Sequence, residues 1–267
     1  MKFVKRSDWE KEWTAVRARE RAYLRKNAQK KPSALDRTLA ERVPATLQST
    51  LESAFCKAFS LVFEQGAGVI QKTYNRKKRA AGAAARRAAA AETGDRDTLR
   101  AFSKDAALSH GKSLALTGVE GVGLGLLGIG IPDIPLFTAV LLRSLYELAD
   151  GYGFPHDSPN EKLFLLRLID GALSYGTELQ ETNAALDRYI GLGRWDAGST
   201  LDAQIARTAR RLSGELLYMK FLQGIPLAGA VGGAYDAVYL HRVQTYARLK
   251  YHKRFLLLQK NQPAFYR

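Results

Sequence analysis

Apolar residues recur every three or four positions through most of this chain, which is the spacing of one face of an α-helix. Residues 9–23 show it clearly, at Trp9, Trp13, Val16 and Tyr23. Residues 47–62 repeat it at a second site along the chain. No strand-type alternation and no Asn-Gly hairpin signal stand out in the 267 residues. The sequence therefore predicts an all-α fold, a multi-helix domain.

Local signals place the ends of several helices. Ser7 and Glu10 have the spacing of a capping box, and Lys30-Lys31-Pro32 is expected to end the helix that they begin. Pro44 suits the first turn of a second helix. We expect a basic amphipathic helix and linker over residues 1–43, and a helical domain over residues 44–267. Further helices are predicted over residues 99–117, 136–150, 159–169, 177–190, 200–222 and 234–260.

Residues 76–97 form a low-complexity stretch of alanine and arginine. Both residue types favour helix, so we predict an exposed helix or a partly ordered arm that ends near Gly94.

Two apolar segments, residues 118–135 and 224–233, are unusually rich in glycine and proline. Each glycine inside a helix costs about 1 kcal/mol relative to alanine, so neither segment is a plain helix. Ile131 to Pro135 should form an extended turn. The glycine spacing in both segments permits close helix packing, either between the two segments in the protein core or in a hairpin that dips into a bilayer. Glu120 and Asp133 favour the core, because acids in hydrocarbon are unfavourable.

The charge of the chain favours anionic partners. Its 41 Lys and Arg against 26 Asp and Glu give a formal net charge of +15. We expect the basic helices near both ends to bind an anionic membrane surface or lipid. Nucleic acid is the less favoured partner, because the sequence contains no helix-turn-helix, zinc-finger or RNP signature. The surface-binding residues predicted are Arg17, Arg21, Arg25, Arg242, Lys250, Lys253 and Arg254.

Cellular context follows from two absences in the sequence. Cys56 is the only cysteine, and the first ten residues contain no apolar signal region. We therefore expect a cytoplasmic protein that can lie at the inner face of the cell membrane.

The segment from Gly128 to Leu136, with the helix 141–149 and Gly151-Tyr152-Gly153 after it, resembles the central signature of the bacterial EcsC family. Residues 224–233 are similar to the second Pro/Gly-rich stretch of that family. The likeness covers most of residues 45–255, and only these two segments carry specific motifs. The first helix and the Ala/Arg stretch look peculiar to this chain. The motif residues are Gly121, Gly125, Gly128, Pro132, Asp133, Pro135, Arg143, Glu147, Gly224, Pro226, Gly229 and Gly233.

The resemblance implies a fold and a membrane-linked context rather than a reaction. The family takes its name from a protein encoded beside an ABC transporter, and its molecular activity is not established. Membrane-transport machinery is therefore among the partners that the resemblance suggests.

No catalytic or cofactor-binding constellation can be recognised. Gly123 to Gly128 match G-x-G-x-x-G without the strand and helix that a dinucleotide needs, and Gly111-Lys112-Ser113 lacks the first P-loop glycine. The four histidines have no metal-ligand spacing and are expected at the surface, so no metal and no cofactor is predicted. A basic nucleic-acid-binding helical protein and a cryptic hydrolase stay as alternative functions.

Asp133 has two interpretations. It can cap a helix beginning at Leu136, or pair with Glu120 as an acid and base in apolar surroundings. The position of Asp133 before the helix favours the cap.

Overall fold

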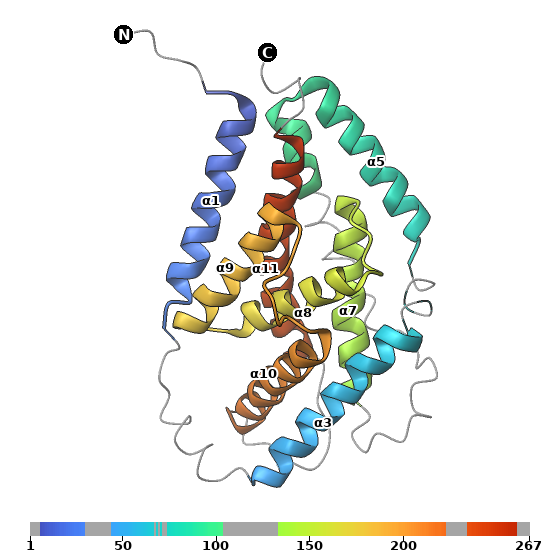
Figure 1. The fold of residues 1–267 in the computed structure, drawn as a ribbon, viewed down its shortest axis with the longest axis vertical. Helices are drawn as coiled ribbons and strands as arrows, with labels where there is room; N and C mark the ends of the chain where they lie inside the picture. Colours follow the sequence, from blue (N-terminus) through green and yellow to red (C-terminus); the bar gives the residue numbers. More distant parts are fainter. Residues whose placement is uncertain are drawn as a thin grey trace.

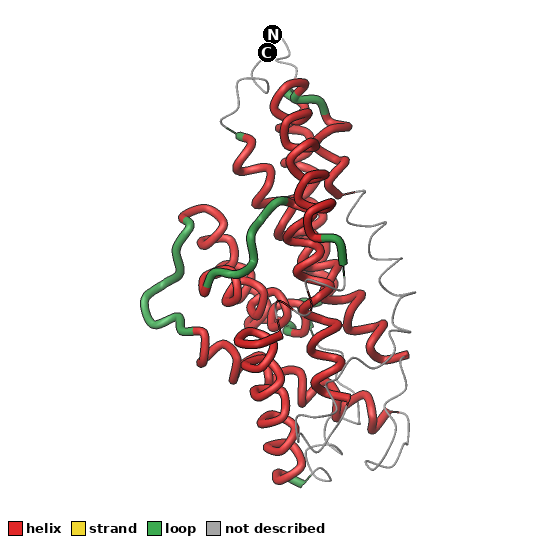
Figure 2. The backbone as a smooth tube through the Cα atoms, turned by 90° about the vertical axis from the view of Figure 1, so that its right-hand side faces the viewer, coloured by secondary structure: helices red, strands yellow, loops and turns green. Residues whose placement is uncertain are grey.

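The computed structural model describes residues 6–29, 44–66, 68, 70, 74–103, 133–222 and 234–260. In these ranges every regular element is a helix and no strand occurs, which confirms the all-α prediction (Figure 2). In chain order the elements are α1 (Asp8–Lys26), α3 (Ala45–Leu61), the π-helix η1 (Val62–Gly66), α5 (Arg76–Thr93), α7 (Asp133–Tyr152), α8 (Pro159–Leu173), α9 (Gly176–Leu192), α10 (Leu201–Leu222) and α11 (Ala234–Gln259). Residues 96–103 are also helical.

Helix α11 occupies the centre of the molecule, and α1, α7, α8 and α9 all pack against it (Figure 1). Tyr246, Lys250, Tyr251 and Phe255 are all fully buried. Successive positions such as Lys250 and Tyr251 point in different directions from a helix, so α11 is surrounded by protein on several sides. Helix α10 packs on α3 and α8. Helix α5 lies along α7.

The predicted capping box of α1 is present. The Ser7 hydroxyl accepts from the backbone of Glu10, and the Glu10 carboxylate accepts from the backbone of Ser7. The helix ends at Lys26, earlier than Lys30-Lys31-Pro32, because Asn27 leaves the helical conformation as its C-cap. Val16 belongs to the main hydrophobic core, so α1 packs as part of the helical body.

The Ala/Arg stretch is an ordered helix packed on the protein. Gly94 ends α5 in the left-handed conformation, with φ of 62°, as the sequence predicts. Ala83 and Ala90 are buried, and the guanidinium groups of Arg86 and Arg87 donate to the backbone carbonyls of Gly151 and Tyr152. Small alanines allow close contact with α7, and the two arginines satisfy carbonyls at its C-terminal end.

The start of α7 differs from the prediction. The helix begins at Asp133, so an extended turn through Pro135 and a cap for a helix starting at Leu136 are both wrong. Pro135 lies within the first turn, where its missing N–H has no helical partner to lose.

Both glycine-rich segments lie largely outside the described residues, which omit 104–132 and 223–233. Their packing against each other therefore stays a prediction. Among the helices that are described, none is both long and apolar enough to cross a membrane.

Candidate functional site: a basic groove beside α1

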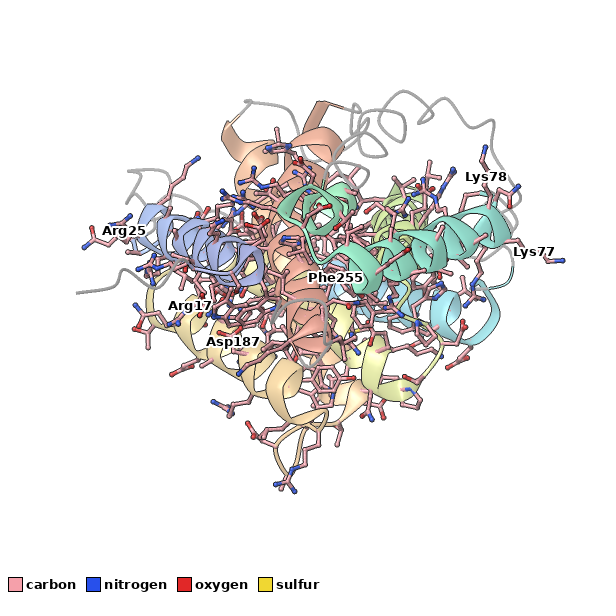
Figure 3. All side chains as sticks on the ribbon, turned by 90° about the horizontal axis from the view of Figure 1, so that it is seen from above. Arg17, Arg25, Lys77, Lys78, Asp187 and Phe255 are labelled. Carbon is pink, nitrogen blue, oxygen red and sulfur yellow. The ribbon has the colours of Figure 1, made fainter. Side chains whose placement is uncertain are left out.

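Three of the predicted surface arginines form a ladder on the outer side of α1. Arg17, Arg21 and Arg25 are exposed, and their spacing of four residues places them along one side of the helix. Within the described ranges none of the three forms an ion pair. Figure 3 shows Arg17 and Arg25 on α1, across the molecule from Lys77 and Lys78 of α5. We refer to Arg17, Arg21 and Arg25 as the α1 ladder.

Lys250, in contrast, does not face solvent, and its predicted surface role is wrong. Its side chain has no exposed area and its ammonium group donates to Glu20 on α1 and to Asp187 on α9, the latter at 2.7 Å. Burial lowers the pKa of Lys250, against the effect of the two carboxylates. Lys253 is nearly buried and bridges the same two acids at 2.7 and 2.8 Å. These charges join three helices rather than forming a surface.

The two arginines predicted on α11 are also mostly enclosed. Arg254 donates two hydrogen bonds of 2.9 and 2.8 Å to Glu161, and its guanidinium lies 4.1 Å from the ring centre of Phe154. Arg242 lies 4.4 Å from the ring centre of Tyr175. The four basic residues of α11 that the sequence predicted at the surface are therefore part of the interior. Their spacing alone did not reveal the acids that face them.

The motif residues Arg143 and Glu147 join α7 to α5. The buried Glu147 carboxylate accepts from Arg143 at 2.9 Å and from Arg79 of α5 at 2.8 Å. Pro135 is buried in the first turn of α7. For Asp133 the structure describes only the backbone. The remaining motif residues, Gly121, Gly125, Gly128, Pro132, Gly224, Pro226, Gly229 and Gly233, lie outside the described residues.

Two of the histidines expected at the surface are buried, His156 and His252. His156 stacks on Tyr146 with ring centres 4.1 Å apart, and its Nε2 lies 3.4 Å from Asp150. The Tyr74 hydroxyl donates to the same aspartate at 2.7 Å. In the ranges that the structure covers, no group of three or more His, Cys, Asp and Glu side chains could hold a metal ion.

Glu12 organises the second charged cluster, between α1, residues 96–103 and α11. Its fully buried carboxylate accepts from Arg100 at 2.8 Å and Arg96 at 3.2 Å, with His252 Nε2 at 3.3 Å and Arg19 at 3.5 Å. Burial raises the pKa of Glu12, but the hydrogen bonds from His252, Arg100 and Arg96 outweigh it and lower the pKa to about 2. The ionised carboxylate therefore holds cationic side chains together at this junction.

Beside Glu12 lies an open groove of about 720 Å³. We call it the basic groove. Four cations line it, Arg19, Lys26, Arg100 and Arg248, and none of the described lining residues is an acid. Lys26 and Arg248 form no ion pair with any residue that the structure describes. The other lining residues are Val16, Ala22, Tyr23, Ser103, Thr245, Leu249 and His252.

Charge and apolar surface thus occur together in the basic groove. Burial lowers the pKa of Arg248, partly offset by Tyr152, so its charge is held in a partly desolvated position. Such a surface can bind an anion more strongly than an exposed arginine does, because water screens the interaction less.

Sequence reasoning missed this groove because its parts come from three distant segments. Arg96 and Arg100 are four residues apart, which places them on the same side of a helix. This spacing was the one sequence signal that could have indicated a basic cluster here. Nothing in the sequence paired them with Glu12, which precedes them by more than eighty residues.

A model of the EcsC protein family matches residues 10–256 of the chain. The match includes α1 and α5, so neither helix lies outside the family region, contrary to the expectation from the sequence. No curated protein and no solved structure matches the chain.

Proposed function

Since this chain belongs to the EcsC family, we propose that it is a peripheral protein of anionic membrane surfaces, which it contacts through the outer side of α1. The α1 ladder is the observation that carries this proposal. It presents three cations in a row, with no described acid to neutralise them.

The expected strength of this contact follows from membrane electrostatics. Each cation near an anionic surface contributes about 1 kcal/mol, so three contribute about 3 kcal/mol. The attraction should weaken with salt, since exposed charges are screened within about 10 Å at 0.1 M ionic strength. Arg19 and Lys26 of α1 line the basic groove instead. With 3.6 residues per turn they lie on a different side of the helix from the α1 ladder, so the proposal rests on the ladder alone.

Vesicle co-sedimentation tests the proposal. Wild type should bind vesicles containing phosphatidylglycerol and not vesicles of phosphatidylcholine alone. The variant Arg17→Gln/Arg21→Gln/Arg25→Gln should lower the partition coefficient by about 100-fold, which corresponds to about 3 kcal/mol.

A matched control separates the ladder from net charge. Lys77→Gln/Lys78→Gln/Arg194→Gln also removes three exposed cations, none of which belongs to α1. It should retain most of the vesicle binding. Equal losses in the two triple variants would contradict a specific role for α1.

Nucleic-acid binding is the competing function for so basic a chain. A salt-dependent affinity for generic duplex DNA greater than that for anionic vesicles would replace the membrane proposal. Membrane-transport machinery, the partner suggested by the family, would be met at the same surface if the vesicle result holds.

A further inference from the structure

Two buried polar atoms close to the basic groove have no hydrogen-bond partner among the described residues. His252 is 2% exposed, and its Nε2 lies beside Glu12 while its Nδ1 is buried without a hydrogen bond. The ring of Tyr152 lies 6.1 Å from that of His252, and its buried hydroxyl also lacks a hydrogen bond. Buried polar groups are nearly always hydrogen-bonded, so these atoms need an explanation.

We infer that the basic groove binds a single molecule of an anionic amphiphile, with a phosphate or carboxylate headgroup among its cations and an apolar chain along its wall. The inference deepens the proposed membrane function and rests on it for the source of the ligand. Membrane adsorption through the α1 ladder does not by itself require a bound ligand, so the amphiphile is an additional assignment for the groove.

Charge defines the headgroup end. Arg100 is anchored by Glu12, while Lys26 and Arg248 have no described acid to neutralise them. Arginine forms directional hydrogen bonds with phosphate and carboxylate oxygens. The ring of His252 lines the groove beside these cations. The groove therefore favours an oxyanion over a neutral or cationic headgroup.

The apolar wall separates an amphiphile from a free anion. Val16, Ala22 and Leu249, together with the ring of Tyr23, line the same groove. Inorganic phosphate would gain nothing from these side chains. An alkyl chain would gain about 0.8 kcal/mol for each methylene that it buries, or about fourfold in affinity. The volume of about 720 Å³ falls in the range of pockets that hold small molecules.

Titration calorimetry with soluble probes tests the inference without a bilayer. Octyl, decyl and dodecyl phosphate, each below its critical micelle concentration, should bind with one-to-one stoichiometry. Affinity should rise about fourfold for each buried methylene until the chain outgrows the groove. Inorganic phosphate should bind at least tenfold more weakly than dodecyl phosphate, and dodecyl maltoside should not bind. Equal affinity for phosphate and dodecyl phosphate would overturn the amphiphile assignment and leave a simple anion site.

Two variants locate the binding. Ala22 is exposed on α1, so Ala22→Trp adds a large ring on the rim of the groove without disturbing the core. We expect it to lower dodecyl phosphate affinity at least tenfold with an unchanged melting temperature. Arg248→Gln should lower it about tenfold through loss of the charge. Unchanged affinity in both variants, or no saturable binding by wild type, would overturn the inference.

The same variants distinguish failure of the inference from failure of the proposed function. The triple variant of the α1 ladder should lose vesicle adsorption yet bind dodecyl phosphate normally, whereas Ala22→Trp should do the reverse. Vesicle adsorption without dodecyl phosphate binding refutes the groove assignment alone. Dodecyl phosphate binding without vesicle adsorption refutes the peripheral-membrane function alone.

Discussion

The carboxylate of Glu12 provides a direct test of the charged junction between α1, residues 96–103 and α11. We consider the variant Glu12→Gln, which keeps the shape of the side chain and removes its charge. The wild-type pKa is lowered from its ordinary value of 4.5 to about 2 in the folded protein. That difference in pKa corresponds to about 3 kcal/mol of folding free energy at neutral pH.

The sign of the pH dependence follows from the lowered pKa. The stabilisation is fully present above pH 4.5, where the carboxylate is ionised in both the folded and the unfolded chain. It decreases as the pH falls towards the folded pKa of about 2. Wild type should therefore be more stable than Glu12→Gln by about 3 kcal/mol at pH 7, by about half as much at pH 3, and by nearly nothing at pH 2.

Urea unfolding of both proteins at pH 7, 5 and 3 measures this difference. Other carboxylates titrate alike in the two proteins, so subtraction isolates Glu12. Glu181→Gln, at an exposed position of α9, should change stability by less than about 0.5 kcal/mol at every pH. A stability difference for Glu12→Gln that is constant from pH 7 to pH 3 would refute the reasoning, as would one below about 1 kcal/mol at pH 7.

Two further pairs of substitutions, each a test and its control, probe packing and the buried lysine. Gly171→Ala would place a methyl group 2.8 Å from the Tyr246 ring and should destabilise the protein by about 1–3 kcal/mol. Gly191→Ala, which has open space around it, should stabilise the protein by about 0.5–1 kcal/mol. Thermal melting of the two variants checks this, and equal melting temperatures would contradict the tight contact at Gly171. Lys250→Ala leaves Glu20 and Asp187 short of a buried partner and should destabilise by roughly 3–5 kcal/mol in urea unfolding. Lys77→Ala is the exposed control for the lysine and should change stability by less than about 0.5 kcal/mol.

Local sequence signals predicted the fold class and several helix ends. The Ser7 and Glu10 capping box and the Gly94 C-cap lie next to the helix ends that they define, so short-range reasoning could find them. It failed at the start of α7, where proline was read as a break although the first helical turn tolerates it.

The candidate site was less predictable because its charges depend on distant partners. The α1 ladder could be predicted from spacing alone, since no described acid faces it. Lys250 and Arg254 are basic residues like those of the ladder, but each pairs with a glutamate far away in the sequence. Glu20 lies 230 positions from Lys250 and Glu161 lies 93 positions from Arg254, and these pairs place both basic side chains in the interior. A single sequence gives no information on such pairs, and the same limit concealed the groove around Glu12.

The contacts between α1 and α11 affect how the chain reaches its native state during synthesis. The Trp9 indole donates to the backbone of Leu256, 247 residues later. At about 5–20 residues per second, a ribosome completes α11 roughly ten to fifty seconds after α1. Until then Glu12 and Glu20 have neither His252 nor Lys250 to contact, and the apolar side of α1 lacks α11, its main packing partner. Helix α1, made before the other helices described, is thus among the last of them to complete its packing, which gives chaperones an interval in which to bind it.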